Sequence, residues 1–109
     1  ILEPMSLAFR SAEALELFKN HCHVIPQAAN DLKATVQESW AWLEPQMVGK
    51  QYICGKRFTL ADIQLFIFAE FGAMIGQGIP EGLPNLQAWF ARIAQRPSVA
   101  ASLHPSQVA

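Results

Sequence analysis

The six residues 58–63, Phe-Thr-Leu-Ala-Asp-Ile, constrain the fold more than any other segment, because they carry a complete signal for the start of a helix. Thr59 is placed to accept a hydrogen bond from the amide of Asp62, and the Asp62 carboxylate is placed to accept one from the amide of Thr59. Phe58 and Ile63 stand at the two positions of a hydrophobic staple. The segment therefore predicts a firmly capped helix.

The helix that follows is predicted to lie in the core. Residues 64–69 read Gln-Leu-Phe-Ile-Phe-Ala, and such a run makes a helix apolar on nearly every side. We expect this helix to run from Leu60 to about Met74, to be buried all round, and to be the element around which the others pack. Gly72 and Gly76 stand four residues apart, and we interpret them as helix-packing or helix-terminating residues rather than as a membrane dimer motif.

Two helical segments are predicted before this central helix, after residues 1–10, which read as the tail of a longer element. Ser11 is placed to cap the first, which should end near His23. The second begins at Pro26, which suits the first position of a helix. Its apolar side chains recur at three-four spacing, as in an amphipathic helix: Ala29, Leu32, Val36, Trp40, Leu43 and Met47.

The segments after the central helix are also predicted to be helical. Residues 78–84 hold two glycines and two prolines and predict a loop. An amphipathic helix follows and stops at Arg96-Pro97, because the residue before a proline disfavours helical geometry. Residues 98–103 add one or two turns. No alternating strand pattern is found, so the sequence predicts one all-α domain, a helical bundle over residues 1–109 with a tail at 104–109.

Composition and charge restrict the partners. The net charge of –1 and eight basic residues without a stripe argue against nucleic acid and against an anionic membrane. No apolar run approaches the roughly 20 residues that span a bilayer. Hydrophobic residues make up 51% and charged residues 16%, so we infer that something else covers part of the apolar surface. Cys22 and Cys54 form no disulfide scaffold, and we expect both to be reduced in a cytoplasmic protein.

The residues alone identify no catalytic group and no metal site. His21-Cys22-His23 cannot converge on one ion within a helix, because adjacent helical side chains point about 100° apart, and a zinc site needs about four ligands. No nucleophile is framed by a base. The aromatic residues are assigned mainly to the core, and a pocket for an apolar ligand is expected at the far end of the central helix, near Phe71 and Met74.

Two ordered motifs resemble the C-terminal all-helical domain of glutathione S-transferases. Residues 55–63, Gly-Lys-Arg-Phe-Thr-Leu-Ala-Asp-Ile, resemble the family segment G-x-x-F-[ST]-x-A-D-I. Residues 84–93 and the following Arg96-Pro97-Ser98 resemble its P-x-L-x-x-W-x-x-R-I and R-P-S stretches. The resemblance covers about residues 11–103. It implies that the glutathione-binding, thioredoxin-like N-terminal domain is absent from this chain, and that the first helix of the helical domain is cut short before Ile1.

The resemblance also implies a function for the parent protein. Such a protein would be a cytoplasmic, homodimeric transferase that conjugates the thiol of its co-substrate glutathione to hydrophobic electrophiles in detoxification. This chain would bind no cofactor, supply no catalytic residue and be inactive alone. It would contribute the interdomain contact, much of the dimer interface and the wall of the hydrophobic-substrate pocket, for which Phe68, Phe71 and Met74 are candidates. Thr59 and Asp62 match the structural N-capping box of the family.

A second function stays open. The same helical domain occurs as a non-catalytic protein-interaction module in translation elongation factors and aminoacyl-tRNA synthetase complexes. The high apolar fraction fits that role equally well. A fused synthetase or elongation-factor domain in the full gene would favour the module, and a thioredoxin-like domain would favour the enzyme.

Overall fold

The computed structural model describes residues 1–107, which form helices joined by short connections. No strand is found within that range, so the predicted all-α fold is confirmed. The elements in chain order, with η for a 3-10 helix, are α1 Leu2–Ser11, α2 Leu15–Phe18, η1 Pro26–Ala28, α3 Ala29–Gln46, α4 Leu60–Met74, α5 Pro84–Ala94, α6 Pro97–Ala101 and η2 Pro105–Gln107.

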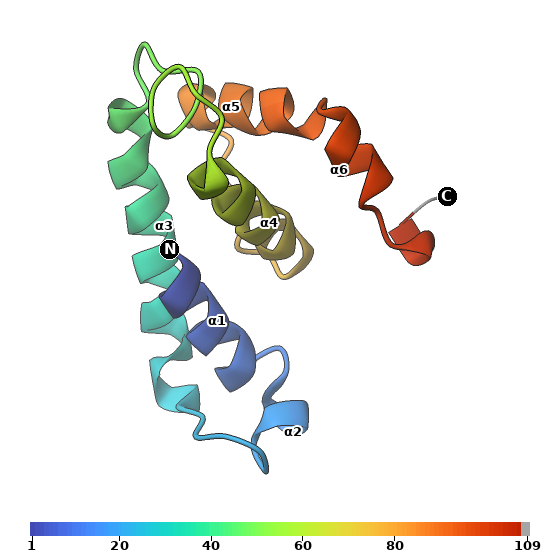
Figure 1. Cartoon of the computed structure of the whole chain (residues 1–109). Coiled ribbons are helices and arrows are strands. Elements are labelled where there is room, and N and C mark those ends of the chain that lie inside the picture. Colours follow the sequence, from blue (N-terminus) through green and yellow to red (C-terminus); the bar gives the residue numbers. More distant parts are fainter. Residues whose placement is uncertain (108–109) are drawn as a thin grey trace.

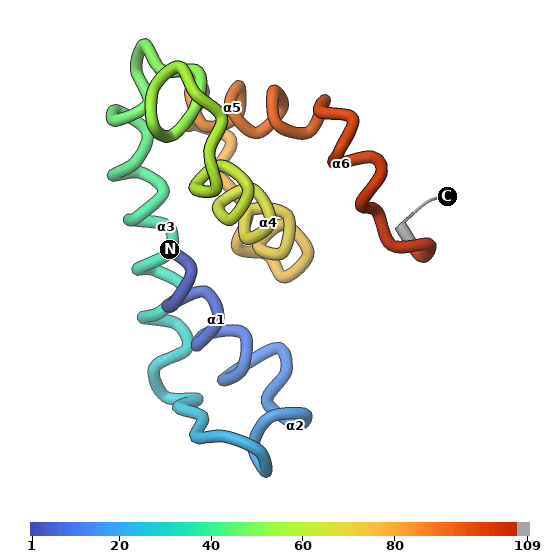
Figure 2. The backbone as a smooth tube through the Cα atoms, viewed as in Figure 1, coloured from blue at the N-terminus to red at the C-terminus, as the bar shows by residue number. Residues whose placement is uncertain are grey.

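α3 contacts α1, η1 and α5, whereas α4 packs mainly against α1 and α5, so the expectation that the other helices surround α4 is wrong. Figure 1 shows α3 along one side of the molecule, with α1 lying against it. α4 contacts both α1 and α5, and α5 contacts α3. The tube in Figure 2 shows how the chain turns after α5 into α6, which leads away from α3. The predicted helices from Pro26 to Met47, over 60–74, after the loop 78–84 and over 98–103 are therefore confirmed, except that residues 26–28 form a 3-10 turn before α3 and α5 already begins at Pro84.

The core lies where α1, α3, α4 and α5 meet. Its two tryptophans, Trp40 and Trp89, are fully buried, and each indole N–H has an acceptor. Trp40 Nε1 donates to the Gln77 carbonyl at 3.4 Å, and Trp89 Nε1 donates to the Asp62 carboxylate at 2.9 Å. The buried cluster is completed by Met5, Val36, Met47, Leu65, Phe66, Ala69, Leu86 and Ile93. Each large side chain buried in it contributes roughly 1.5–3 kcal/mol.

Asp62 does more than the capping box requires. It is fully buried, and its Oδ2 atom accepts the amide hydrogen of Thr59 at 2.9 Å, as the box demands. Its Oδ1 atom accepts the amide hydrogen of Ile53 at 2.9 Å as well as the indole hydrogen of Trp89. One carboxylate therefore joins the connector before α4, the start of α4 and the middle of α5.

The threonine half of the box is the looser half. Thr59 adopts the extended backbone of an N-cap and its side chain faces the amide of Asp62. No hydrogen bond of ordinary geometry forms between that hydroxyl and that amide. The hydroxyl lies instead 3.4 Å from Asp62 Oδ2 and 3.5 Å from Cys54 Sγ. We therefore regard the bond from the Thr59 amide to Asp62 as the stronger contact.

The end of α4 is built around two glycines. Gly76 has a φ of +77°, and the amide of Gln77 donates to the Gly72 carbonyl at 2.6 Å, which is the Schellman arrangement. A Cβ atom on Gly72 would lie 2.7 Å from the Gln77 carbonyl oxygen and 2.8 Å from Met5 Cε. The interpretation of these glycines as packing and termination residues is confirmed.

A glutamate from α3 caps α5. Glu44 Oε1 accepts the amide hydrogen of Asn85 at 2.7 Å, and Oε2 accepts that of Leu86 at 2.9 Å. These amides belong to the first turn of α5, where backbone N–H groups have no acceptor within their own helix. A negative charge there also suits the helix dipole. Glu44 therefore fixes the angle between α3 and α5, a role the sequence did not reveal.

The prediction of a helix from Ser11 to about His23 is wrong. Ser11 is the last residue of α1, and its Oγ atom accepts the amide hydrogen of Ile25 at 3.0 Å. Only α2 is helical in this stretch, and none of its residues is buried. A helix this short needs tertiary packing to persist. Because α2 buries no side chain, the segment folds as turns around one helical turn.

The prediction that α4 is buried all round is also wrong for this chain. Buried residues lie on one side of the helix: Asp62, Leu65, Phe66, Ala69 and Gly72. The opposite side carries apolar residues that other elements leave exposed. Because both sides are apolar in the sequence, hydrophobicity did not distinguish them.

Candidate functional site

The outer face of α4 is an apolar surface that the other helices leave uncovered. It consists of Leu60, Ile63, Ile67 and Met74, whose spacing places them on one side of a helix. They are 73%, 41%, 54% and 77% exposed, respectively. Soluble monomers rarely leave such a continuous patch uncovered. A hollow lies on each side of this face.

One hollow lies between α1 and α4. This α1–α4 hollow has a volume of about 280 Å³ and is lined by Ser6, Ile67, Phe68 and Phe71. The Phe71 ring packs edge-on against the Phe9 ring of α1, with centroids 4.9 Å apart, and against Phe68 at 6.3 Å. Edge-to-face aromatic pairs hold their rings in defined orientations. The hollow is therefore an apolar site with a fixed aromatic wall and one hydroxyl.

A second hollow lies between α4 and the α5–α6 segment. This α4–α6 groove has a volume of about 320 Å³. Its lining is mainly apolar, with one carboxylate and two serines: Phe58, Ile63, Phe66, Ile67, Glu70, Ile93, Ser98, Val99, Ser102 and Leu103. Ile67 lines both hollows, so it forms the ridge between them. The outer face of α4 thus separates two apolar cavities.

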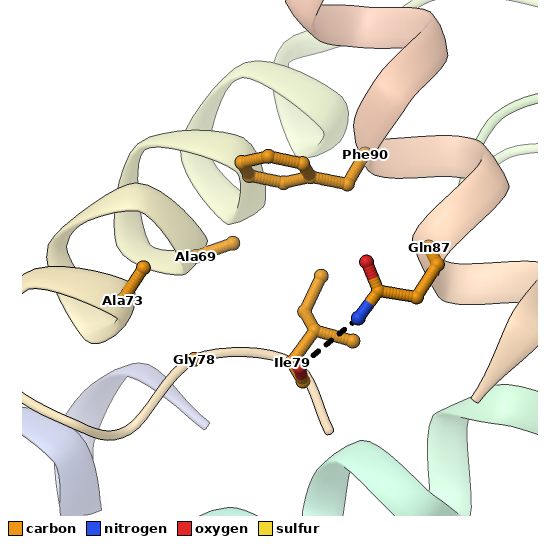
Figure 3. A pocket seen from close by; sticks show the side chains of 6 residues that line it. All are labelled: Ala69, Ala73, Gly78, Ile79, Gln87 and Phe90. Carbon is orange, nitrogen blue, oxygen red and sulfur yellow. Dashed lines mark hydrogen bonds between the residues drawn. The ribbon is translucent and has the colours of Figure 1, made fainter. Parts of the chain in front are cut away.

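A third, smaller pocket of about 130 Å³ is lined by other residues of α4, together with the loop and α5 that follow (Figure 3). Ala69 and Ala73 form one wall, and Phe90 stacks on Phe66 with centroids 4.8 Å apart. The Gln87 amide nitrogen donates to the Ile79 carbonyl at 3.1 Å and is thereby held by the loop. None of its lining residues is ionisable, so we treat it as a packing gap.

Of the three predicted pocket residues, the structure brings two together. Phe68 and Phe71 line the α1–α4 hollow, but Met74 does not line it and lies on the outer face. Ser6, Ile67 and the supporting Phe9 were not predicted. Ile67 was not predicted because α4 was expected to be buried all round. The α1 residues were not predicted because residues 1–10 were interpreted as the tail of a helix that is cut short before Ile1.

Within residues 1–107, the histidine and cysteine side chains of residues 21–23 do not form a metal site. His21-Cys22-His23 lies in a turn after α2, and no group of three or more His, Cys, Asp or Glu side chains in the described part could hold a metal ion. Burial acts to raise the pKa of the Glu13 carboxyl, but the hydrogen bond from Lys33, 2.6 Å away, and the charge of that residue hold this pKa below its ordinary value. Within residues 1–107, no helix has both the length and the hydropathy needed to cross a bilayer.

Comparison with known proteins assigns the fold to a family. Residues 7–97 match the family of the glutathione S-transferase C-terminal domain. Glutathione S-transferase 2 of Saccharomyces cerevisiae is 28% identical over 104 residues, covering 91% of this chain and 42% of that protein. Glutathione S-transferase GstA of Escherichia coli O157:H7 is 29% identical over 68 residues, covering 62% of this chain and 33% of that protein.

A solved structure supports the same assignment. The crystal structure of a glutathione S-transferase domain-containing protein from Marinobacter aquaeolei aligns with a TM-score of 0.76 and 29% identity, covering 91% of this chain and 48% of that one. The chain therefore spans less than half the length of each of these proteins, and residues 1–107 contain no thioredoxin-like domain. The resemblance found in the sequence is confirmed: the chain belongs to the glutathione S-transferase family, as a C-terminal helical domain.

Proposed function

We propose that this chain is the helical domain of a glutathione transferase, and that the α1–α4 hollow receives the hydrophobic electrophile. The observation that supports this most is the hollow itself, in a chain that belongs to the family: it is apolar, open and walled by Phe68 and Phe71. A concave apolar site with few polar groups suits a small hydrophobic ligand. The electrophile would lie against the aromatic wall, with the Ser6 hydroxyl as its polar contact.

In this proposal, the parent protein joins the glutathione sulfur to an electrophilic carbon of the bound molecule. Glutathione is the co-substrate, and a thioredoxin-like domain would bind it and lower the pKa of its thiol. This domain would hold the electrophile near that thiol and exclude water, so its contribution is positioning. The Thr59–Asp62 box and the Asp62 contacts would keep α4, and with it the aromatic wall, at a fixed angle.

The outer face of α4 would be the contact with the thioredoxin-like domain. Leu60, Ile63 and Met74 are exposed in this chain, and covering them would bury apolar area that favours docking. A second surface is available for a homodimer contact: Trp42 of α3 is 67% exposed, which is unusual for so large an apolar side chain. The two surfaces together would account for the high apolar fraction of the sequence.

The experiment compares two truncations of apolar side chains to alanine in the intact parent protein. Phe71→Ala shortens the wall of the α1–α4 hollow, whereas Ile79→Ala shortens the lining of the small pocket in Figure 3. With glutathione and a chloronitrobenzene as substrates, Phe71→Ala should lower kcat/KM by about tenfold, since loss of an apolar contact near 1.4 kcal/mol gives that factor. The KM for glutathione should stay unchanged, and Ile79→Ala should match the wild type.

Two outcomes would contradict the proposal. Equal losses from Phe71→Ala and Ile79→Ala would show that the hollow does not contact the electrophile. A parent protein that neither binds immobilised glutathione nor conjugates the chloronitrobenzene would favour the alternative, a non-catalytic module whose outer face docks another protein.

A further inference from the structure

The α4–α6 groove contains one charged side chain among its apolar residues. Glu70 is half-buried, and its neighbours on α4 that line the groove are Ile63, Phe66 and Ile67. Among residues 1–107, the ion pairs are Lys19–Glu16 and Lys33–Glu13, so Glu70 forms none. No hydrogen bond to its carboxylate is formed within that range either. The carboxylate is therefore satisfied by solvent in this chain.

The basic residues of the adjoining α5 region have other partners. The guanidinium carbon of Arg96 lies 3.6 Å from the centroid of the Phe58 ring, in a cation–π contact. Arg92 donates to the carbonyl of Gln51 at 2.6 Å. Neither forms an ion pair with Glu70. The anionic charge of the groove is thus uncompensated from within the fold.

Any surface that covers the groove removes water from the Glu70 carboxylate. Removing a carboxylate from water is strongly unfavourable unless a cation and hydrogen bonds replace the water. The apolar lining favours burial of the groove under another surface, and the carboxylate opposes it. A stable occupant therefore has to present both an apolar side chain and a cationic side chain. Arginine is well suited, because its guanidinium pairs with a carboxylate through two hydrogen bonds.

We propose that the occupant is the rest of the parent protein, which inserts an apolar side chain into the groove and pairs an arginine or lysine with Glu70. This inference rests on the proposed function. This chain covers 42% and 48% of the full length of two of its relatives, so more than half of each relative lies outside the matched region and is available to cover the groove. The pair positions that domain, because Glu70 lies on α4 one helical turn from Ile67, the ridge shared with the α1–α4 hollow.

The test is a charge swap in the intact parent protein. Glu70→Lys should lower Tm by about 5 °C or more, as expected for breaking a buried ion pair in a protein of this size. It should also lower kcat/KM for conjugation by about tenfold, through misplacement of the glutathione site. Reversing one arginine or lysine of the other domain to glutamate should restore both values in the Glu70→Lys background. Glu38→Lys, at an exposed position of α3, is the matched control and should change neither.

Three results would overturn the inference. The first is an unchanged Tm in Glu70→Gln, which would show that the pair contributes nothing. The second is that reversing any single arginine or lysine of the other domain fails to rescue Glu70→Lys. The third is that the rescuing cation belongs to a second copy of this chain. An active wild-type enzyme with any of these results would leave the proposed function intact, whereas rescue in a protein without glutathione activity would refute the proposed function alone.

Discussion

The two sides of α4 are both apolar in sequence but have opposite roles. The inner side packs into the core, and its one charged residue, Asp62, is fully buried because three N–H groups bind its carboxylate. The outer side, with Ile63 and Ile67, stays exposed and borders two hollows. The comparison teaches that hydrophobicity alone does not locate a core. The hydrogen bonds of one carboxylate and the positions of neighbouring helices decide which apolar side is buried.

The largest expected effect is on the inner side, at Asp62. Asp62→Ala leaves the amides of Ile53 and Thr59 and the indole of Trp89 without their acceptor. Each hydrogen bond to a charged group is worth about 1.5–3 kcal/mol, so the loss should exceed about 3 kcal/mol, a large part of a domain's stability of roughly 5–15 kcal/mol. Urea unfolding followed by circular dichroism measures it.

Asp31→Ala is the matched control for Asp62→Ala. Asp31 is exposed in the first turn of α3 and should contribute less than about 1 kcal/mol, through the helix dipole. Equal losses at the two positions would show that the buried carboxylate does not organise the fold.

A smaller effect is expected at Gly72, where the inner side of α4 meets α1. Gly72→Ala places a methyl group against the Gln77 carbonyl and Met5, at distances that force one of them to move. Such overpacking should cost about 1–3 kcal/mol. Gly82→Ala is the control, because its Cβ would meet nothing within 4 Å. A neutral Gly72→Ala would mean that α1 and α4 pack less closely than the structure shows.

The smallest of the three effects is expected at Thr59. Thr59→Ala removes the looser half of the box but keeps the bond from the Thr59 amide to Asp62, so the loss should be about 1 kcal/mol. Thr35→Ala, at an exposed position inside α3, should change stability by less than about 0.5 kcal/mol. Thermal and denaturant midpoints that do not respond to Thr59→Ala would refute the capping role.

Local signals in the sequence predicted most of the fold. The start of α4 at Leu60, its end before Gly76 and the break between α5 and α6 at Arg96-Pro97 follow from caps, glycines and prolines that act within a few residues, although Pro84 was expected in the loop and is the first residue of α5. The resemblance to the family placed Phe68 and Phe71 in a pocket wall. Periodicity and capping signals thus predicted most of the helices, and the family motifs led to two of the residues in the pocket wall.

Contacts between distant residues could not be predicted in this way. Ser11 accepts the amide of Ile25, fourteen residues later, which breaks the helix expected there. Glu44 caps α5 from α3, across more than forty residues. Neither contact has a spacing rule, because each depends on where helices meet in space. The exposure of Ile67 was unpredictable for the same reason.

The central claim is that the rest of the parent protein covers the outer face of α4, and isoleucine methyl groups test it most directly. With labelled isoleucine methyls and a soluble paramagnetic probe, NMR reports which methyls contact solvent. In this chain Ile63 and Ile67 are 41% and 54% exposed, Ile25 is 43% exposed and Ile93 is 1% exposed. In the intact protein, Ile63 and Ile67 should be as protected as Ile93, while Ile25 stays accessible. If Ile63 and Ile67 relax as fast as Ile25, nothing covers this face and the claim is wrong.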